Sequence, residues 1–483
     1  MVERPKDAKP ISNKWVFVRK FDKEGNLLKY KARLVAKGCA QRPGYDFDQT
    51  FSPVVQLETI RGILAIVPSK QLKMRQIDVK GAYLNGHLQE QVYMRQPEGF
   101  DDKSGKVCLL IKTLYGLKQS GREWNKELDL QLKSRGFTNL WSDPCAYIRR
   151  HDEDFEVITV WVDNLLLFIS NSLLEEKLVD ELNSMFELSD LGGPSKIVRI
   201  EISQTDNSVT ISQKKYLMLI LHKEGMDKAN PVSMPLDPNM KLEPNPEGEE
   251  DSERQNAYAL LLGSLQYLST ATRPDITFVV NRLAAYTKNP SLAHYTALKR
   301  VLRYLAGTKD YGITYRRDGT PPDNENLFHG YSDAAYANTD DLKSTSGYVF
   351  LVKLNSGAIT WGSKKQSTIT LSTTEAEYVA ISEASREAIW PRHLYGELGF
   401  AQKQATLLLG DNDGSIAMAK NPQFHRRTKH IELRWHWVRN LVQDGLLDLK
   451  NCRNPDQTAD VLTKALPKPK HQKHVKELGL TAV

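Results

Sequence analysis

Short apolar runs separated by turn residues occur in the first part of the chain, where they predict β-strands. The stretch KWVFVRKFDKEGNLLKYKARLVAKG predicts two strands joined by a turn at Gly25-Asn26. Further along, VITVWVDNLLLFIS at 157–170 has an apolar run on each side of Asp163 and Asn164. This pattern predicts a buried β-hairpin that carries a carboxylate and an amide at its turn.

Apolar residues spaced three and four apart predict helices in other stretches. GREWNKELDLQLKSRGF predicts a helix that ends near Gly136, and SLLEEKLVDELNSMFEL predicts a second amphipathic helix. Three more helices are predicted by ERQNAYALLLGSLQYLSTA, DITFVVNRLAAYT and LAHYTALKRVLRYLAG. Their Tyr and Leu spacing is typical of helix packing rather than of a cofactor site.

Strand and helix patterns alternate in the last third of the chain. LFHGYSDAAY, SGYVFLV and AITWGS predict strands, and STTEAEYVAISEASREAIWPRHLYGEL predicts a long helix. A strand at ATLLLGDN, a helix, a strand near GLLDLKNC and a terminal helix from DQTADVLTKAL follow. Alternation of this kind is typical of an α/β domain.

Two polar segments divide the chain into domains. LDPNMKLEPNPEGEEDSER is rich in proline and acidic residues, which predicts a surface linker, and RRDGTPPDNEN is a second break. A chain of 483 residues is expected to hold two to four domains. The predicted segments are 1–235, the linker 236–254, a helical part 255–320, an α/β domain 327–466 and a basic C-terminal tail 467–483.

The composition, with 40% hydrophobic and 26% charged residues, fits a soluble globular protein. The four cysteines are scattered without a CxxC pair, which argues against a disulfide framework or a structural zinc site and favours a reducing compartment. No apolar run approaches the length of a membrane span, and the N-terminal MVERPKDAKP lacks a signal-peptide core. We therefore expect neither secretion nor a membrane partner.

The net charge of +7 is unevenly distributed. Residues 1–40 carry eleven Lys/Arg against four Asp/Glu, and residues 420–440 carry six against one, together with three histidines. Basic surfaces of this kind fit a polyanionic partner such as nucleic acid. Each cluster taken alone is better explained by a solvated charged face.

A second carboxylate lies in IDVKGAYL, where Asp78 follows the predicted strand QLKMRQI. Carboxylates brought together at strand ends repel each other unless a cation neutralises them. Oxygen-only clusters suit Mg²⁺ or Mn²⁺, and a two-metal site could activate a nucleotide 3′-OH and clamp a triphosphate. Taken separately, Asp78 is explained by a turn or cap and Asp163 by a hairpin turn, so their pairing depends on the surrounding sequence.

Six stretches stand in order along the chain: KARLVAKGCAQRPGYDFDQTFSPVV, IDVKGAYLNGHLQEQVYMRQPEGF, LYGLKQSGREW, VWVDNLLLFISN, TRPDI and LKRVLRYLAGT. This series resembles the reverse transcriptase of copia-like (Pseudoviridae) LTR retrotransposon Pol polyproteins over nearly the whole chain. The resemblance implies an α+β right-hand polymerase with fingers, palm and thumb. It also implies a helical connection and an α/β ribonuclease H-like domain with a mixed five-stranded sheet.

The resemblance implies roles for residues of the first domain. Asp78 and Asp163 would be the palm metal ligands, and Lys31 and Arg33 would contact the triphosphate. Tyr83 would lie under the sugar and exclude a 2′-OH. The structural alternatives are two exposed strand cations and a buried palm tyrosine.

The loop LYGLKQSG, with Lys118, resembles the family loop that contacts the template and the incoming base. The hairpin departs from the family pattern at two positions. Trp161 replaces the usual Tyr or Phe and keeps a large ring at the primer end, whereas Asn164 replaces an Asp and removes one negative charge. If this position ligates a metal directly, a loss of ~2–4 kcal/mol of transition-state stabilisation is expected. If Asp78 and Asp163 bridge both ions, the site survives with weaker metal affinity.

A second carboxylate set lies in GYSDAAYA, LSTTEAEYVAI, LLLGDNDGSIA and DQTADVLTKAL, and its members are Asp333, Glu375, Asp411 and Asp460. Glu375 lies near a predicted helix start that Ser372 or Thr373 would cap. The order strand-Asp, helix-Glu, strand-Asp, helix-Asp resembles ribonuclease H, in which four carboxylates hold two Mg²⁺ across a scissile phosphate. The neighbouring Glu377 is expected to face solvent, and Asp413 to be a turn residue.

The basic stretch HRRTKHIELRWHWVRN predicts phosphate contact by Arg426, Arg427 and Lys429. Its histidines are five and six residues apart, so they do not stack on one helix face and no metal site is expected there. The structural alternative is a basic amphipathic helix with its apolar residues packed inward, and both can hold.

The predicted function is RNA-directed DNA synthesis with ribonuclease H activity, using two Mg²⁺ (or Mn²⁺) at each site. The partners would be an RNA template, a DNA primer, an RNA–DNA hybrid and dNTPs, in a cytoplasmic virus-like particle or in the nucleus. Because of Asn164, two alternatives stay open: a truncated or degenerate remnant that binds nucleic acid, and a chain that cleaves RNA without synthesis. The sequence does not determine the oligomeric state.

Overall fold

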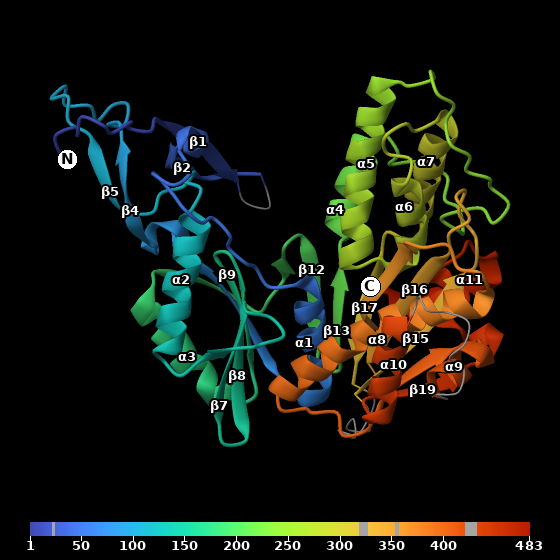
Figure 1. Ribbon diagram of the computed structural model, residues 1–483. Helices are drawn as coiled ribbons and strands as arrows, with labels where there is room; N and C mark the ends of the chain where they lie inside the picture. The colour runs from blue at the N-terminus through green and yellow to red at the C-terminus, as the bar shows by residue number, and fades with distance from the viewer. Residues whose placement is uncertain (22–24, 318–326, 353–356, 421–431) are drawn as a thin grey trace. The chain divides into compact units, whose positions relative to one another are not determined.

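The computed structural model describes residues 1–21, 25–317, 327–352, 357–420 and 432–483. They form two compact units (Figure 1). The first unit consists of Met1–Gln56 and Lys73–Gly193, and the second of Leu57–Leu72 and Pro194–Val483. From residue 194 onward the chain belongs to the second unit, whereas the predicted first segment runs to 235.

An antiparallel sheet of six strands forms the centre of the first unit. Its order is β10 (Leu188–Gly192), β3 (Lys73–Val79), β9 (Asn164–Ile169), β8 (Asp154–Trp161), β7 (Ala146–His151) and β6 (Thr138–Asn139). β8 and β9 form the predicted hairpin, and every residue from 165 to 169 is buried. A continuously buried run of this kind requires cover on both faces of the strand, which holds the turn before it in place.

Two strand pairs and two helices complete the first unit. β1 (Asn13–Phe21) pairs with β2 (Leu27–Ala36), as the sequence predicts, and β4 (His87–Met94) pairs with β5 (Cys108–Lys112). The two predicted amphipathic helices are α2 (Ser120–Lys133) and α3 (Ser172–Met185), and α3 packs on β9.

The second unit contains a helical core beside an antiparallel sheet. The helices are α4 (Lys214–Lys223), α5 (Ser252–Ala271), α6 (Thr277–Ala284) and α7 (Leu292–Gly307), of which the last three were predicted. The sheet has the order β11 (Lys196–Ile197), β12 (Ile200–Thr205), β13 (Ser208–Ser212), β14 (Tyr311–Arg316) and β20 (Leu480–Ala482). The proline-rich segment 236–254 contributes Leu236 and Leu242 to the helical core, so it is partly packed against the fold.

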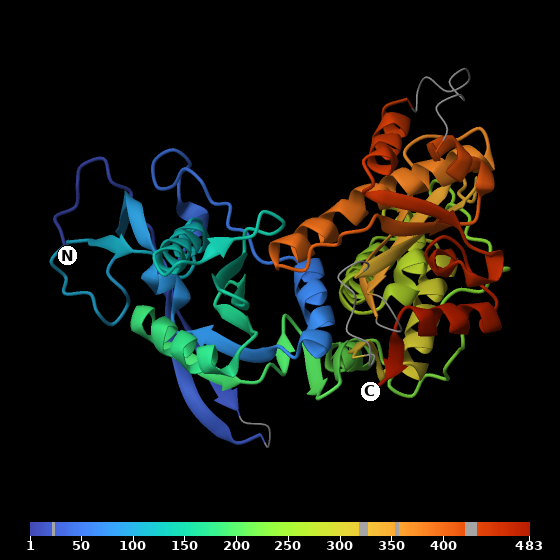
Figure 2. The same cartoon turned by 90° about the horizontal axis from the view of Figure 1, so that it is seen from below.

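A mixed five-stranded sheet, as predicted, is the second sheet of this unit. Its order is β17 (Ala358–Lys365), β16 (Thr345–Val352), β15 (Phe328–Ala335), β18 (Thr406–Gly410) and β19 (Leu447–Asn451). β15 pairs antiparallel with β16 and parallel with β18. The long helix α8 (Thr373–Glu397), orange in Figure 2, packs on β15 and β16, and α9 (Asp413–Lys420) and α10 (Glu432–Gln443) pack beside it.

The helix α1 (Leu57–Lys70), which the sequence pattern did not reveal, belongs to the second unit. It packs on β13, β14, β17 and α8. Its Arg61 is only 2% exposed and donates to the carbonyls of Ile359 and Thr270 at 2.7 and 2.8 Å. The buried guanidinium therefore joins strands and helices that are about 200 to 300 residues away in sequence.

The C-terminal segment differs from its prediction in two ways. The expected helix from DQTADVLTKAL is a 3-10 turn, Thr458–Leu462, and residues 467–483 are not a tail. They form α11 (Lys468–Glu477) and the strand β20, whose Leu480 pairs with Ile313 of β14. Buried His471 and His474 attach α11 to the fold.

Candidate active sites

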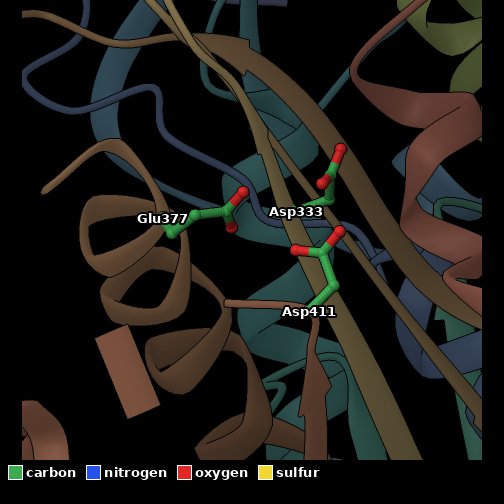
Figure 3. Close-up of side chains that lie close together, drawn as sticks. All are labelled: Asp333, Glu377 and Asp411. Carbon is green, nitrogen blue, oxygen red and sulfur yellow. The ribbon is translucent and has the colours of Figure 1, made fainter. Parts of the chain in front are cut away.

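Three carboxylates of the second unit meet at one end of its mixed sheet. Asp333 lies on β15, Asp411 directly follows β18, and Glu377 lies in the second turn of α8. Each offers an oxygen, and these oxygens all lie within 4.8 Å of one another. Figure 3 shows Glu377 reaching from its helix toward the two aspartates. We call these three residues the carboxylate cluster.

The cluster contains Glu377 in the place predicted for Glu375, so the expectation that Glu377 faces solvent is wrong. Glu377 is only 7% exposed. Glu375 is buried too, but its Oε2 accepts a hydrogen bond from the Leu371 backbone N–H at 2.7 Å. Ser372 caps the helix as predicted, because its hydroxyl accepts from the Glu375 N–H. Glu375 therefore completes the start of the helix and is not a member of the cluster.

Burial and mutual repulsion make the negative charges of the cluster costly. Burial, and then the charges of Asp333 and Asp411, raise the pKa of Glu377 to about 9. Burial also raises the pKa of Asp411 and, against the opposing charge of Lys464, that of Asp333. Such a set of oxygens favours either protons or a hard divalent cation.

Asp460, the fourth predicted carboxylate, lies beside the cluster without joining it. It is 1% exposed, and its charge raises the pKa of both Asp333 and Asp411. Lys464 Nζ lies 2.7 Å from Asp460 Oδ1 and 3.5 Å from Asp333 Oδ2, and Lys470 binds Asp460 Oδ2. The sequence analysis missed both lysines.

The other predicted site lies in the first unit, where β3 and β9 pair. Asp78 on β3 is directly opposite Asn164, the first residue of β9. Asp163 precedes Asn164 at the turn, and its carbonyl accepts from the Val79 N–H at 2.7 Å. Val162 takes a positive φ of 57°, which tightens this turn. The hairpin therefore brings Asp163 next to Asp78, as predicted.

Charge around Asp78 is balanced by nearby cations. Burial, and then the negative charge of Asp163, raises the pKa of Asp78, whereas Lys20, Lys31 and Arg33 act in the opposite direction. Lys31 and Arg33 are two residues apart on β2, so they lie on the same face of that strand. Burial and the neighbouring cations lower the pKa of Lys31. A triphosphate is the kind of anion that such a cationic strand face would bind.

The amide of Asn164 is held by two neighbours. Its Oδ1 accepts from Gln76 Nε2 at 3.2 Å, and its Nδ2 donates to Asp163 Oδ1 at 3.1 Å. The second contact exists only because this residue is an amide, since an aspartate would repel Asp163. One oxygen of Asp163 is therefore engaged by a neutral donor.

Two of the remaining predicted residues, Tyr83 and Trp161, lie near the hairpin, and the third, Lys118, contacts Phe47. Tyr83 lies edge-on to Tyr115 at 5.3 Å, and burial and the charge of Asp163 raise its pKa. Trp161 is half-buried and lies opposite Asn164 on β8. Lys118 Nζ lies 4.7 Å from the ring centroid of Phe47.

Comparisons with known proteins point to one family. Residues 1–238 match the model of the family described as reverse transcriptase (RNA-dependent DNA polymerase). The chain is 39% identical to the Retrovirus-related Pol polyprotein from transposon TNT 1-94 of Nicotiana tabacum, over 98% of this chain and 36% of that protein. It is 30% identical to the putative transposon Ty5-1 protein of Saccharomyces cerevisiae, over 64% of this chain and all of that protein.

The chain belongs to the reverse transcriptase family of copia-type retrotransposon Pol polyproteins. It is also 38% identical to the Pol polyprotein from transposon RE2 of Arabidopsis thaliana, over 99% of this chain and 32% of that protein. The chain thus spans about a third of the length of these two relatives. The family match at 1–238 includes both carboxylates of the hairpin site.

A solved structure supports the fold of this reverse transcriptase family member. The foamy viral protease-reverse transcriptase in complex with double-stranded DNA aligns with a TM-score of 0.51. The alignment covers 92% of this chain and 65% of that one at 14% identity, so the likeness concerns the fold alone. The described residues contain no helix that is both long and apolar enough to cross a membrane.

Three predicted nucleic-acid contacts, Arg426, Arg427 and Lys429, lie outside the residues that the structure describes. Their contact with phosphate stays a prediction. The structure instead adds Lys20, whose charge acts on Asp78 together with Lys31 and Arg33. The sequence predicts the strand that carries Lys20. The pairing of β1 with β2 is what places Lys20 on the same face as Lys31 and Arg33.

Proposed function

We propose that this chain is an RNA-directed DNA polymerase with a ribonuclease H activity, each using a pair of divalent cations, Mg²⁺ or Mn²⁺. Its partners would be an RNA template, a DNA primer, dNTPs and the RNA–DNA hybrid that synthesis leaves behind. It would act in a virus-like particle or the nucleus, as expected of a retrotransposon protein. The carboxylate cluster is the single observation that best supports an enzymatic function.

The residues of the cluster fit a hard cation. Three carboxylate oxygens within 4.8 Å suit the oxygen ligands that Mg²⁺ and Mn²⁺ prefer, and no thiol or imidazole belongs to the group. Asp333, Glu377 and Asp411 would hold one ion, with Asp460 as the nearest further ligand. Asp78 and Asp163 would hold ions at the hairpin site.

When bound, divalent cations at either site would activate the attacking oxygen and stabilise the leaving oxygen of a phosphoryl transfer. The protein's own residues supply binding and orientation. At the hairpin site, Lys31 and Arg33 would bind the triphosphate, and Tyr83 would lie under the sugar and exclude a 2′-OH. Trp161 would support the primer end, and Lys118 the template and incoming base.

At the cluster, β15 positions Asp333, the end of β18 positions Asp411, and the helix α8 positions Glu377. The buried carboxylates would orient water toward the scissile phosphate of the RNA strand. Because both β15 and β18 are central strands of the sheet, the two aspartates are held rigidly, which favours in-line attack. Little base preference is expected, since phosphate contacts dominate such binding.

Two assays test this function. Purified chain with Mg²⁺ is offered a primed RNA template with dNTPs and, separately, a labelled RNA–DNA hybrid. We expect extension in the first assay and cleavage in the second. A chain that does neither under conditions where it binds the hybrid would overturn the proposal.

Asn164 supports a second candidate function, in which the chain cleaves hybrid RNA but does not synthesise DNA. The substitution removes one negative charge beside Asp78 and Asp163, while the carboxylate cluster keeps all of its acidic residues. Cleavage without extension in the two assays would support this alternative. Binding without either activity would instead identify a degenerate remnant.

A further inference from the structure

Asp460 is a buried carboxylate with a lysine ammonium in ion-pair distance of each of its two oxygens. Lys464 Nζ lies 2.7 Å from Oδ1, and Lys470 binds Oδ2. With both oxygens paired in this way, Asp460 can ligate a divalent cation only by giving up one ion pair. Breaking an ion pair at a buried carboxylate is costly, so the cation must offset this cost.

The two lysines reach Asp460 in different ways. Lys464 follows Asp460 by four residues and also lies 3.5 Å from Asp333, so it bridges Asp460 to the carboxylate cluster. Lys470 comes from α11, which lies in the C-terminal segment. Its side chain is 29% exposed, in contrast to the 1% of Asp460.

The position of Lys470 is set by contacts outside the mixed sheet. The next residue, His471, is buried and lies edge-on to Tyr304 of α7 at 5.4 Å. Beyond the helix, Leu480 pairs with Ile313 of β14. α11 is therefore anchored on the helical core and the other sheet of the unit, as well as on the segment of Asp456 and Thr458, and it carries a cation to the edge of the cluster.

We infer that Lys470 is a positioning residue that holds Asp460 away from the carboxylate cluster and weakens the binding of a second divalent cation. The inference rests on the proposed function, because it assumes that the cluster binds a first cation. It assigns a role in cleavage to the C-terminal segment 467–483. Without the Lys470 charge, Asp460 would keep its pair with Lys464 and could offer Oδ2 to the ion.

Calorimetric titration of the full chain with Mn²⁺, without nucleic acid, tests the inference. The hairpin site is silenced with Asp78→Asn and Asp163→Asn so that only the cluster binds. We expect Lys470→Met to lower the Kd of the second, weaker Mn²⁺ binding step roughly tenfold, because one competing ion pair is lost. Lys470→Gln gives the same expectation if the methionine variant does not fold.

Matched variants separate this effect from a structural one. Lys468→Met changes an exposed lysine on the same helix and should leave both binding steps unchanged. Lys470→Arg keeps the charge and should restore the wild-type affinity. In an Asp460→Asn background, Lys470→Met should have no effect, because the residue through which it acts is gone.

The outcomes distinguish the inference from the proposed function. Suppose that Asp333→Asn abolishes the first binding step, but Lys470→Met has the same affinity for the second ion as Lys468→Met. The inference about Lys470 is then wrong, and the cation site at the cluster stands. If the wild-type chain binds no Mn²⁺ that depends on Asp333, the proposed function fails at this site, and the inference fails with it.

Discussion

Glu375 and Glu377 lie two residues apart in α8, and their carboxylates face different partners. Glu375 accepts from the Leu371 backbone at the start of the helix, whereas Glu377 faces Asp333 and Asp411. Position on the helix, rather than residue type, decides which glutamate belongs to the site. Separate substitutions of Glu375 and Glu377 therefore test the two roles independently.

We predict that Glu377→Gln abolishes cleavage of a labelled RNA–DNA hybrid, whereas Glu375→Ala retains it. The alanine variant should lose about 1 kcal/mol of unfolding free energy, because the helix loses a cap contact. Chemical denaturation measures this loss. Equal cleavage by wild-type and Glu377→Gln would exclude Glu377 from the chemistry.

A signal for this assignment was present in the sequence. Ser372 and Glu375 form the S-x-x-E pattern of a capping box, which already explains Glu375 by a local contact. The burial of Glu377 is a tertiary property, since it depends on β15 and β18 meeting beside the helix. The resemblance to ribonuclease H pointed to Asp333, Asp411 and Asp460 in the sequence; in the structure Asp333 and Asp411 belong to the cluster and Asp460 lies beside it.

The raised pKa of Glu377 predicts a pH dependence of stability in the metal-free protein. Its native pKa of about 9 lies above the ordinary 4.5, so the native state retains a proton that the unfolded state releases. Stability from this group is complete below pH 4.5 and is lost as pH rises toward 9. Melting temperatures in EDTA should fall over this range, and less steeply in Glu377→Gln. Identical slopes in both proteins would contradict the assignment.

Asn164 gives a prediction for the polymerase site. Asn164→Asp removes the donor to Asp163 and adds a negative charge opposite Asp78, which should strengthen divalent cation binding. We expect primer extension at fixed Mg²⁺ to rise roughly 10²-fold. Gln76→Ala, which also loses a contact with Asn164 but adds no charge, is the control. An unchanged extension rate in Asn164→Asp would reject the role of charge at this position.

Among the elements, α1 shows how a single buried cation can join distant segments. Arg61 donates to carbonyls of Ile359, Thr270 and Ala271, pairs with Glu58 at 2.9 Å, and lies 4.2 Å from the ring centroid of Trp361. The carbonyls of Thr270 and Ala271 come from the last residues of α5, where a helix leaves its acceptors unpaired. The guanidinium satisfies them.

We predict that Arg61→Met destabilises the second unit by about 3–5 kcal/mol, because several buried acceptors lose their donor. Arg61→Lys should recover only part of this, since an ammonium lacks the planar fork that reaches separate carbonyls. Urea denaturation monitored by tryptophan fluorescence measures both variants. A loss below about 1 kcal/mol in Arg61→Met would show that α1 is not held by this residue.

Elements with strong local patterns were predictable, and those shaped by tertiary contacts were not. The hairpin β8–β9 and helices α2, α3 and α5 follow from apolar runs and helical spacing. α1 was missed because ILAIVP at 63–68 is a continuous apolar run that includes Pro68, so this part of the helix shows no polar face in the sequence. The C-terminal segment was taken for a tail because its charge dominates the sequence, whereas two buried histidines and a short strand attach it.

Across the whole molecule, neither compact unit corresponds to one continuous stretch of the chain. The first unit is interrupted by Leu57–Leu72, which folds with the second. The family match ends at 238, whereas the compact units divide at 193. The second unit therefore depends on a helix encoded within the polymerase part of the sequence.

This dependence predicts the behaviour of a fragment. Residues 194–483 alone lack α1 and should unfold at a lower temperature than the second unit of the intact chain. A peptide of residues 57–72 should bind the fragment and raise its melting temperature, as a ligand of the native state does. The same peptide with Arg61→Met should bind at least roughly tenfold more weakly, because it loses buried hydrogen bonds. A fragment that is as stable without the peptide would contradict this prediction.

The central claim is that distant acidic residues converge on divalent cations at two places in the chain. Anomalous diffraction from crystals of the protein soaked in Mn²⁺ tests it directly. We predict manganese peaks between Asp333, Glu377 and Asp411, and beside Asp78 and Asp163. Saturating Mn²⁺ that yields no peak at either place, or peaks only at unrelated surface carboxylates, would contradict it.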